Sequence, residues 1–176
     1  MFRYAAIYGS IAGVVIIAIL GTVLTVWGER EFATSMTLGY LVMLVILSLL
    51  FVGVKRYRDV ELGGTIRFGR AFGLGAAIAA IAGVFYALSW EVVLAVTDFA
   101  FIEQYSAAMA DQARSLPEAE RAAQLEEIES FKQMYRNPLF RLPMTFVEIF
   151  PVGLVVALVS ALLLKNPKVL PARRKA

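Results

Sequence analysis

Apolar residues in this chain are gathered into long blocks separated by polar segments. Four such blocks stand out: Ala5–Val26, Ala33–Val54, Ala71–Trp90 and Leu142–Leu164. A helix needs about 20 mostly apolar residues, each rising 1.5 Å, to cross the hydrocarbon core of a bilayer. Every block meets this length, and only the last contains a charge, Glu148. The pattern predicts four transmembrane helices, at about residues 5–26, 33–54, 71–96 and 140–164.

The composition supports a membrane protein rather than a soluble domain. Hydrophobic residues make up 60% of the chain and charged residues 18%, whereas a soluble domain carries about 25% charged residues. We therefore expect an all-α polytopic membrane protein that forms a single domain over residues 1–176. The first block is longer than the 7–15 or so apolar residues of a cleavable signal. It leads into Trp27-Gly28-Glu29-Arg30, so we expect it to remain as an anchor.

Basic residues are distributed unequally between the polar segments. We assign successive polar segments alternately to the two sides of the membrane. The side that contains both termini and loop 55–70 then has eleven Lys and Arg residues and two acidic residues. The other side has six basic and ten acidic residues. Because Lys and Arg concentrate in cytoplasmic loops, we expect an inner-membrane protein with both termini in the cytoplasm. The basic tail is then a topology signal and a contact for anionic lipids, not a nucleic-acid site.

Small residues recur every four positions in the third block. They are Ala71, Gly75, Ala79, Gly83 and Ala87. Helices in lipid associate where small residues let their backbones approach, and the first and fourth blocks carry shorter stripes of the same kind. We therefore expect tight contacts among the first, third and fourth spans, with the second span the most exposed to lipid. Packing within one bundle is favoured over a homodimer face, although a homo-oligomer is left open.

The loop before the third block combines glycines, arginines and an aromatic residue. Gly63-Gly64 permits a turn with positive φ, and Arg67, Phe68 and Arg70 are expected at the headgroup level. An interfacial turn is favoured over a phosphate-binding loop, since the segment lacks the spacing of a Walker motif.

The longest polar segment, residues 98–136, is predicted to form an extracytoplasmic helical hairpin. Apolar residues recur at helical spacing before and after a break at Leu116-Pro117, and Ser115 with Glu118 matches a capping box. These apolar residues are Phe99, Ile102, Tyr105 and Met109, then Leu125, Ile128, Phe131 and Tyr135. The second helix carries Glu118, Glu120, Glu126, Glu127 and Glu129. A solvated acidic face is favoured, and a docking surface for a partner or a ligand mouth is the alternative.

The carboxylate within the fourth span is the main candidate for chemistry. An ionised carboxylate inside a bilayer costs at least a few kcal/mol, so Glu148 is expected to face the bundle. Pro151 and Gly153 follow and predict a kink. The candidate polar site is Glu148, Glu91, Arg141, Thr145, Tyr86 and Ser89. Either a structural hydrogen bond or a proton or cation relay would use such residues, and we favour the structural role.

The motifs Glu61–Phe72 (ELGGTIRFGRAF) and Glu148–Gly153 (EIFPVG), together with four spans and a long polar hairpin, have a counterpart in a known family. In these features the chain resembles the domain-of-unknown-function 4199 family of four-span bacterial membrane proteins. The resemblance covers nearly the whole chain. It implies a bacterial inner-membrane protein without an assigned activity, so it carries over no catalytic residue.

The residue types absent from the chain narrow its function. It has no Cys and no His, which excludes thiolate chemistry, Ser–His catalysis and His-ligated metals. We expect no enzyme, cofactor or metal. The leading hypothesis is a non-enzymatic structural or accessory subunit in the lipid bilayer, with a protein partner bound through 98–136. The alternative is a small proton- or cation-coupled transporter or channel that uses Glu148.

Overall fold

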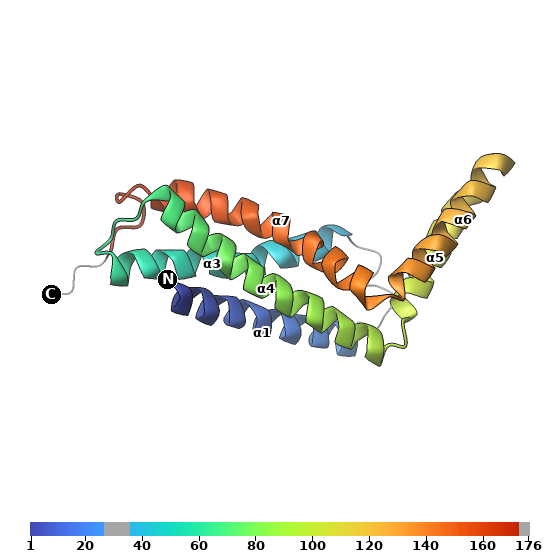
Figure 1. Ribbon diagram of the computed structural model, residues 1–176, viewed down its shortest axis with the longest axis horizontal. Helices are drawn as coiled ribbons and strands as arrows, with labels where there is room; N and C mark the ends of the chain where they lie inside the picture. Colours follow the sequence, from blue (N-terminus) through green and yellow to red (C-terminus); the bar gives the residue numbers. More distant parts are fainter. Residues whose placement is uncertain (27–35, 173–176) are drawn as a thin grey trace.

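The computed structural model describes residues 1–26 and 36–172, and its secondary structure is helical throughout that part of the chain (Figure 1). The helices are α1 (Phe2–Val26), α3 (Met36–Glu61), α4 (Phe68–Val96), α5 (Ala100–Ala113), α6 (Glu118–Tyr135) and α7 (Pro138–Leu164). Four of them, α1, α3, α4 and α7, lie side by side as a bundle. The other two, α5 and α6, project from one end of it and are called the arm below. The predicted all-α class is confirmed for the described residues.

Three helices are long and apolar enough to cross a membrane. They are α1 over Phe2–Ile19, α4 and α7. The second predicted span begins at Ala33, which lies outside the described residues, as do Trp27–Arg30 and the basic residues 173–175. The count of four spans therefore stays a prediction. The helices α4 and α7 begin a few residues before their apolar blocks. In α7 this earlier start is set by Pro138 at the first turn and by Asn137, whose side chain accepts a hydrogen bond from the Leu139 amide at 3.0 Å.

Helix α4 lies at the centre of the bundle, with α1 and α7 both packed against it. The stripe of small residues on α4 forms its contact with α7. A Cβ added at Gly75 would lie 2.8 Å from the Ala157 Cβ, and one added at Gly153 would lie 2.6 Å from the Ala79 Cβ. Such distances leave no room for a larger residue, so the helix backbones are as close as glycine allows. The stripe thus serves packing within the chain.

Helix α3 contributes a buried face of large aliphatic residues. Leu47, Leu50 and Val54 are almost inaccessible, and α3 contacts α1, α4 and α7. Gly53 allows the Tyr8 ring of α1 to approach, since an added Cβ would lie 2.8 Å from that ring. The second apolar block is therefore an integral part of the bundle.

The matched glycines Gly75 and Gly73 on α4 test this packing. We expect Gly75→Ala to destabilise the protein by about 1–3 kcal/mol, because the new methyl group collides with Ala157 in a closely packed interface. At Gly73 the nearest atom to an added Cβ is the flexible end of Met1, 3.9 Å away. Gly73→Ala should therefore leave the midpoint of thermal unfolding in detergent unchanged or slightly raised. Equal effects of the two substitutions would contradict the predicted close contact between α4 and α7.

Arg58, near the end of α3, is completely buried. Its Nη1 donates to the carbonyl of Val169 at 2.9 Å and, more weakly, to that of Leu164 at 3.4 Å. Its Nη2 donates to the Leu170 carbonyl at 2.5 Å. The last carbonyls of a helix have no partner within the helix. The Arg58 guanidinium therefore closes the end of α7 and holds the segment that follows against α3.

Asp59 completes this contact at the end of α3. Its carboxylate accepts hydrogen bonds from Arg58 Nε at 2.7 Å and from Lys55 Nζ at 2.5 Å. Burial by itself raises the pKa of Asp59, but the two cations outweigh it and leave the pKa below its ordinary value. The carboxylate is therefore charged at neutral pH and balances the buried guanidinium.

The turn between α3 and α4 has the geometry predicted for it. Gly63 and Gly64 have φ of 63° and 92°, a region that residues with a Cβ enter only with strain. The Gly64 amide donates to the Arg58 carbonyl at 2.9 Å, which ends α3 and directs the chain into α4.

Candidate functional site

The joint between the bundle and the arm contains several side-chain contacts between helices. Helix α4 ends at Val96, and α5 begins only four residues later. Between them, Asp98 and Phe99 have φ of 49° and 60°. A left-handed conformation is uncommon for residues other than glycine, and for a bulky one it is strained. Neighbouring contacts must therefore hold this joint in place.

Arg141, in the first turn of α7, supplies those contacts. Its guanidinium pairs with the Glu91 carboxylate of α4 through two parallel hydrogen bonds, that from Nε being 2.7 Å long. Its Nη1 donates to the Tyr135 carbonyl at 2.7 Å, at the end of α6. It also lies over the Phe99 ring, 5.2 Å from the centroid, which is within the range of a cation–π interaction. One buried cation thus joins α4, α6, α7 and the strained joint.

Aromatic side chains surround the ion pair. Trp90 Nε1 donates to the Tyr135 hydroxyl at 2.8 Å, and the Trp90 ring meets Phe101 edge to face at 4.9 Å. Burial raises the pKa of the Tyr135 phenol above its ordinary value. We call Trp90, Glu91, Phe99, Tyr135 and Arg141 the junction cluster. Its charges are paired, with the Arg141 side chain 5% exposed and that of Glu91 24% exposed.

The structure brings only part of the predicted polar site together. Glu91 and Arg141 form the ion pair just described. Thr145 and Ser89 instead donate to carbonyls of their own helices, Arg141 at 2.9 Å and Phe85 at 2.6 Å. These bonds satisfy the hydroxyls locally and leave them unavailable to Glu148.

Glu148 lies at the edge of the buried face of α7, not within it as we had expected. The buried face of α7 repeats every four residues and consists of Arg141, Thr145, Ile149, Gly153, Ala157 and Ala161. Glu148 precedes Ile149 by one position, so it lies beside this face and is exposed. Its carboxylate lies near the Tyr86 hydroxyl of α4. Glu148 follows Thr145 by three positions and Arg141 by seven, which predicted that it shares their face of the helix. The buried positions of α7 instead recur every four residues, so Glu148 falls to one side of them.

Pro151 lies on the exposed side of α7, and the helix continues through it and through Pro143 without ending. Gly153 is buried against α4. The two residues therefore serve different purposes: the proline leaves one carbonyl without its helical partner, while the glycine allows close packing.

The arm consists of α5 and α6 packed along one another. Its apolar residues meet between the helices, where Tyr105 lies 6.3 Å from Phe131 between ring centroids. Lys132 Nζ donates to Glu103 at 2.8 Å across the pair. The predicted capping box is wrong. Ser115 donates to the Gln112 carbonyl at 2.8 Å, because Pro117 occupies the cap position and α6 starts only at Glu118.

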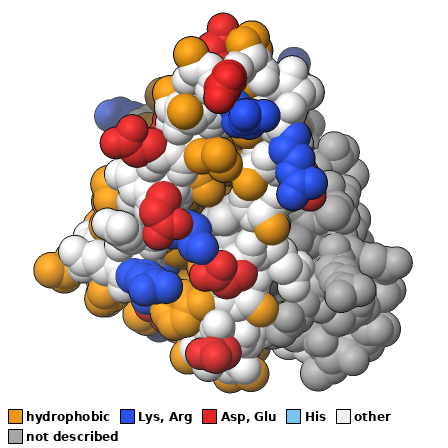
Figure 2. All heavy atoms as spheres, turned by 90° about the vertical axis from the view of Figure 1, so that its right-hand side faces the viewer, with side chains coloured by type: hydrophobic (Ala, Val, Ile, Leu, Met, Phe, Trp, Pro, Cys, Tyr) orange, Lys and Arg blue, Asp and Glu red, His pale blue; other side chains and the backbone are white. Residues whose placement is uncertain are grey.

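The outer surface of the arm is mainly acidic. Residues 98–136 contain eight acidic and four basic residues, a net charge of −4. All five glutamates predicted for the second helix are exposed. Leu116, Leu125 and Met134 are also exposed, at 36%, 43% and 46%. Figure 2, which views the molecule from the arm, shows charged and apolar side chains interspersed on this face. Among the described residues, no group of three acidic side chains has the arrangement of a metal site.

Sequence reasoning identified Glu91 and Arg141 but not their pairing, and it overlooked Trp90. The sequence did contain a signal for this ion pair, because Glu91 and Arg141 lie at the same end of the predicted third and fourth spans. Buried charges near a bilayer are usually paired. The hydropathy pattern does not predict the hydrogen bond between Trp90 and Tyr135.

Comparison with known protein families gives a match over most of the chain. The model of a family described as "Protein of unknown function (DUF4199)" matches residues 7–166. No curated protein and no solved structure matches the chain significantly.

Proposed function

We propose that this protein, which belongs to the DUF4199 family, is a non-enzymatic accessory subunit of the membrane that binds a partner protein through its arm. Three helices long and apolar enough to cross a bilayer support the membrane location. The charge asymmetry of the loops supports an inner-membrane orientation with both termini in the cytoplasm. In that orientation the arm lies outside the cytoplasm.

The observation that carries this proposal concerns the arm. Its base is held to the bundle by side-chain contacts, while the side chains on its outer surface are exposed. The junction cluster holds the arm to the bundle through an ion pair of which the Arg141 side chain is only 5% exposed. Beyond the cluster, the glutamates of α6 and the apolar residues beside them face outward. Fixing a surface before binding lowers the entropy cost of association. The chemistry of the surface indicates a partner with basic residues around apolar ones.

Transport through Glu148 has less support. The Glu148 side chain is exposed and lies outside the buried face of α7. Of the two pockets described, one is lined by residues of the 62–70 segment and the other by apolar residues of α1 and α4 together with Ser89. Neither contains Glu148, so neither connects it to a polar pathway.

Neutralising three acidic residues of α6 tests the proposal. We expect Glu126→Gln, Glu127→Gln and Glu129→Gln in one variant to abolish chemical cross-linking of the arm to its partner in native membranes, because the attraction to a basic surface is removed. The partner is identified by mass spectrometry of the cross-linked product.

The matched control is Arg114→Gln, which neutralises an exposed arm residue of opposite sign. It should retain the cross-link, and the insertion of both variants should equal that of the wild type. The proposal fails if the wild-type arm gives no specific cross-linked protein, or if the triple variant keeps it.

A further inference from the structure

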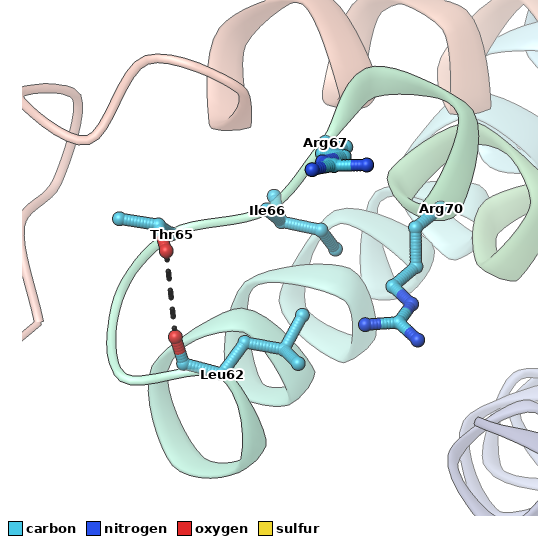
Figure 3. A pocket seen from close by; sticks show the side chains of 5 residues that line it. All are labelled: Leu62, Thr65, Ile66, Arg67 and Arg70. Carbon is cyan, nitrogen blue, oxygen red and sulfur yellow. Dashed lines mark hydrogen bonds between the residues drawn. The ribbon is translucent and has the colours of Figure 1, made fainter.

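An open pocket of about 560 Å³ lies at the end of the bundle opposite the arm. It is lined by Leu62, Thr65, Ile66, Arg67 and Arg70 (Figure 3). The pocket is formed where the turn after α3 leads into α4. Its walls are apolar on the side of Leu62 and Ile66 and cationic on the side of α4.

The two arginines of this pocket are exposed and unpaired. Within residues 1–26 and 36–172, neither side chain forms an ion pair or a hydrogen bond. The nearby Glu61 accepts a hydrogen bond from the Tyr4 hydroxyl at 2.9 Å instead. Two guanidinium groups three residues apart, with no acid between them, attract an anion that both can contact.

The backbone beside the arginines is also open. Arg67 is the cap residue of α4, and no side chain bonds to the first turn. The amides of Arg70 and Ala71 donate to the Arg67 carbonyl, whereas those of Phe68 and Gly69 have no protein partner in the described chain. Nothing lies within 4 Å of a Cβ built at Gly69. Free amides at a helix start add to the attraction that the arginines exert on an anion.

The position of the pocket in the bundle distinguishes a lipid from other anions. Between the two arginines, Phe68 is exposed and stacks on Phe72 with 6.0 Å between ring centroids. From Ala71 onward α4 carries no charge until Glu91. Cationic and aromatic side chains at the start of an apolar span are typical of the headgroup layer, where a phosphate and its acyl chains are present together.

We propose that this pocket binds the phosphate of an anionic phospholipid headgroup. The two guanidinium groups contact the phosphate oxygens, and the acyl chains lie along the apolar side of α4 that begins at Phe68. The inference rests on the membrane location proposed above but not on the partner of the arm, so the two proposals fail independently.

The test uses the full chain, delipidated in detergent, with binding of dioleoyl phosphatidylglycerol measured by native mass spectrometry. We expect the double variant Arg67→Gln, Arg70→Gln to lose affinity by roughly 25-fold, since each Arg at an anionic surface contributes a factor of about five. Dioleoyl phosphatidylcholine, which has no net charge, should bind weakly to both proteins. The variant Arg67→Lys, Arg70→Lys should keep part of the affinity and serves if the first variant does not fold.

The matched control is Arg3→Gln with Arg56→Gln, which removes two exposed charges from the same predicted side and should retain binding. Equal losses in control and test variants would overturn a localised site, as would equal binding of both lipids. Competition by millimolar inorganic phosphate as strong as that by the lipid would assign the pocket to a free anion and overturn the lipid proposal.

Discussion

Replacing Arg58 by alanine is expected to be among the most damaging single changes in this protein. The side chain is completely buried, and it supplies donors to the carbonyls of Val169 and Leu170. Its removal leaves these acceptors without partners and Asp59 without one of its two cations. Removing one partner of a buried ionic contact costs about 3–5 kcal/mol. We expect a large fall in the thermal unfolding midpoint in detergent and rapid proteolysis after α7.

Two further variants isolate the cause. Arg56 lies two positions earlier and is exposed, so Arg56→Ala should leave both readouts close to those of the wild type. Arg58→Lys keeps the charge but lacks the planar fork that reaches several carbonyls at once, and it should give an intermediate loss. If Arg58→Ala unfolds at the same temperature as Arg56→Ala, the side chain does not hold the end of α7.

The elements of this fold are readable from the sequence because membrane spans are governed by length and hydropathy. Blocks of 20 or more apolar residues predict helices that satisfy their own backbone groups. In the same way, the interval of four between Gly75 and Ala79 predicts which side of α4 meets another helix. The Gly63-Gly64 pair predicts its turn, since only glycine enters that region of φ easily.

The polar contacts are not readable in this way. Arg58 reaches residues more than 100 positions later, and Arg141 reaches Glu91 50 positions earlier. Which charge meets which depends on helix rotation, and an error of one residue turns a side chain by about 100°. Glu148 illustrates this sensitivity: its neighbour Ile149 is buried, while Glu148 itself is exposed.

Replacing Arg141 by alanine is expected to loosen the arm and to destabilise the protein by about 3–5 kcal/mol, because it leaves the mostly buried Glu91 carboxylate without its cation. Arg141 also lies over the Phe99 ring. Its removal therefore takes away a contact that holds the left-handed backbone at Asp98 and Phe99. The chain has no cysteine, so spin labels can be placed at Ala108→Cys in the arm and Val84→Cys in the bundle. The distribution of distances between these labels should broaden strongly in the Arg141→Ala variant.

The control for this measurement is Arg114→Ala, at the far end of α5, where the side chain is 80% exposed and pairs with Asp111. It should leave the distance distribution narrow. The double variant Glu91→Gln, Arg141→Gln replaces the ion pair by neutral amides, which can still bond to one another, and it should recover part of the stability because no buried charge is left alone. A narrow distribution in Arg141→Ala would mean that the aromatic contacts of Trp90 and Tyr135 alone fix the arm. The surface proposed for partner binding would then be held without the ion pair.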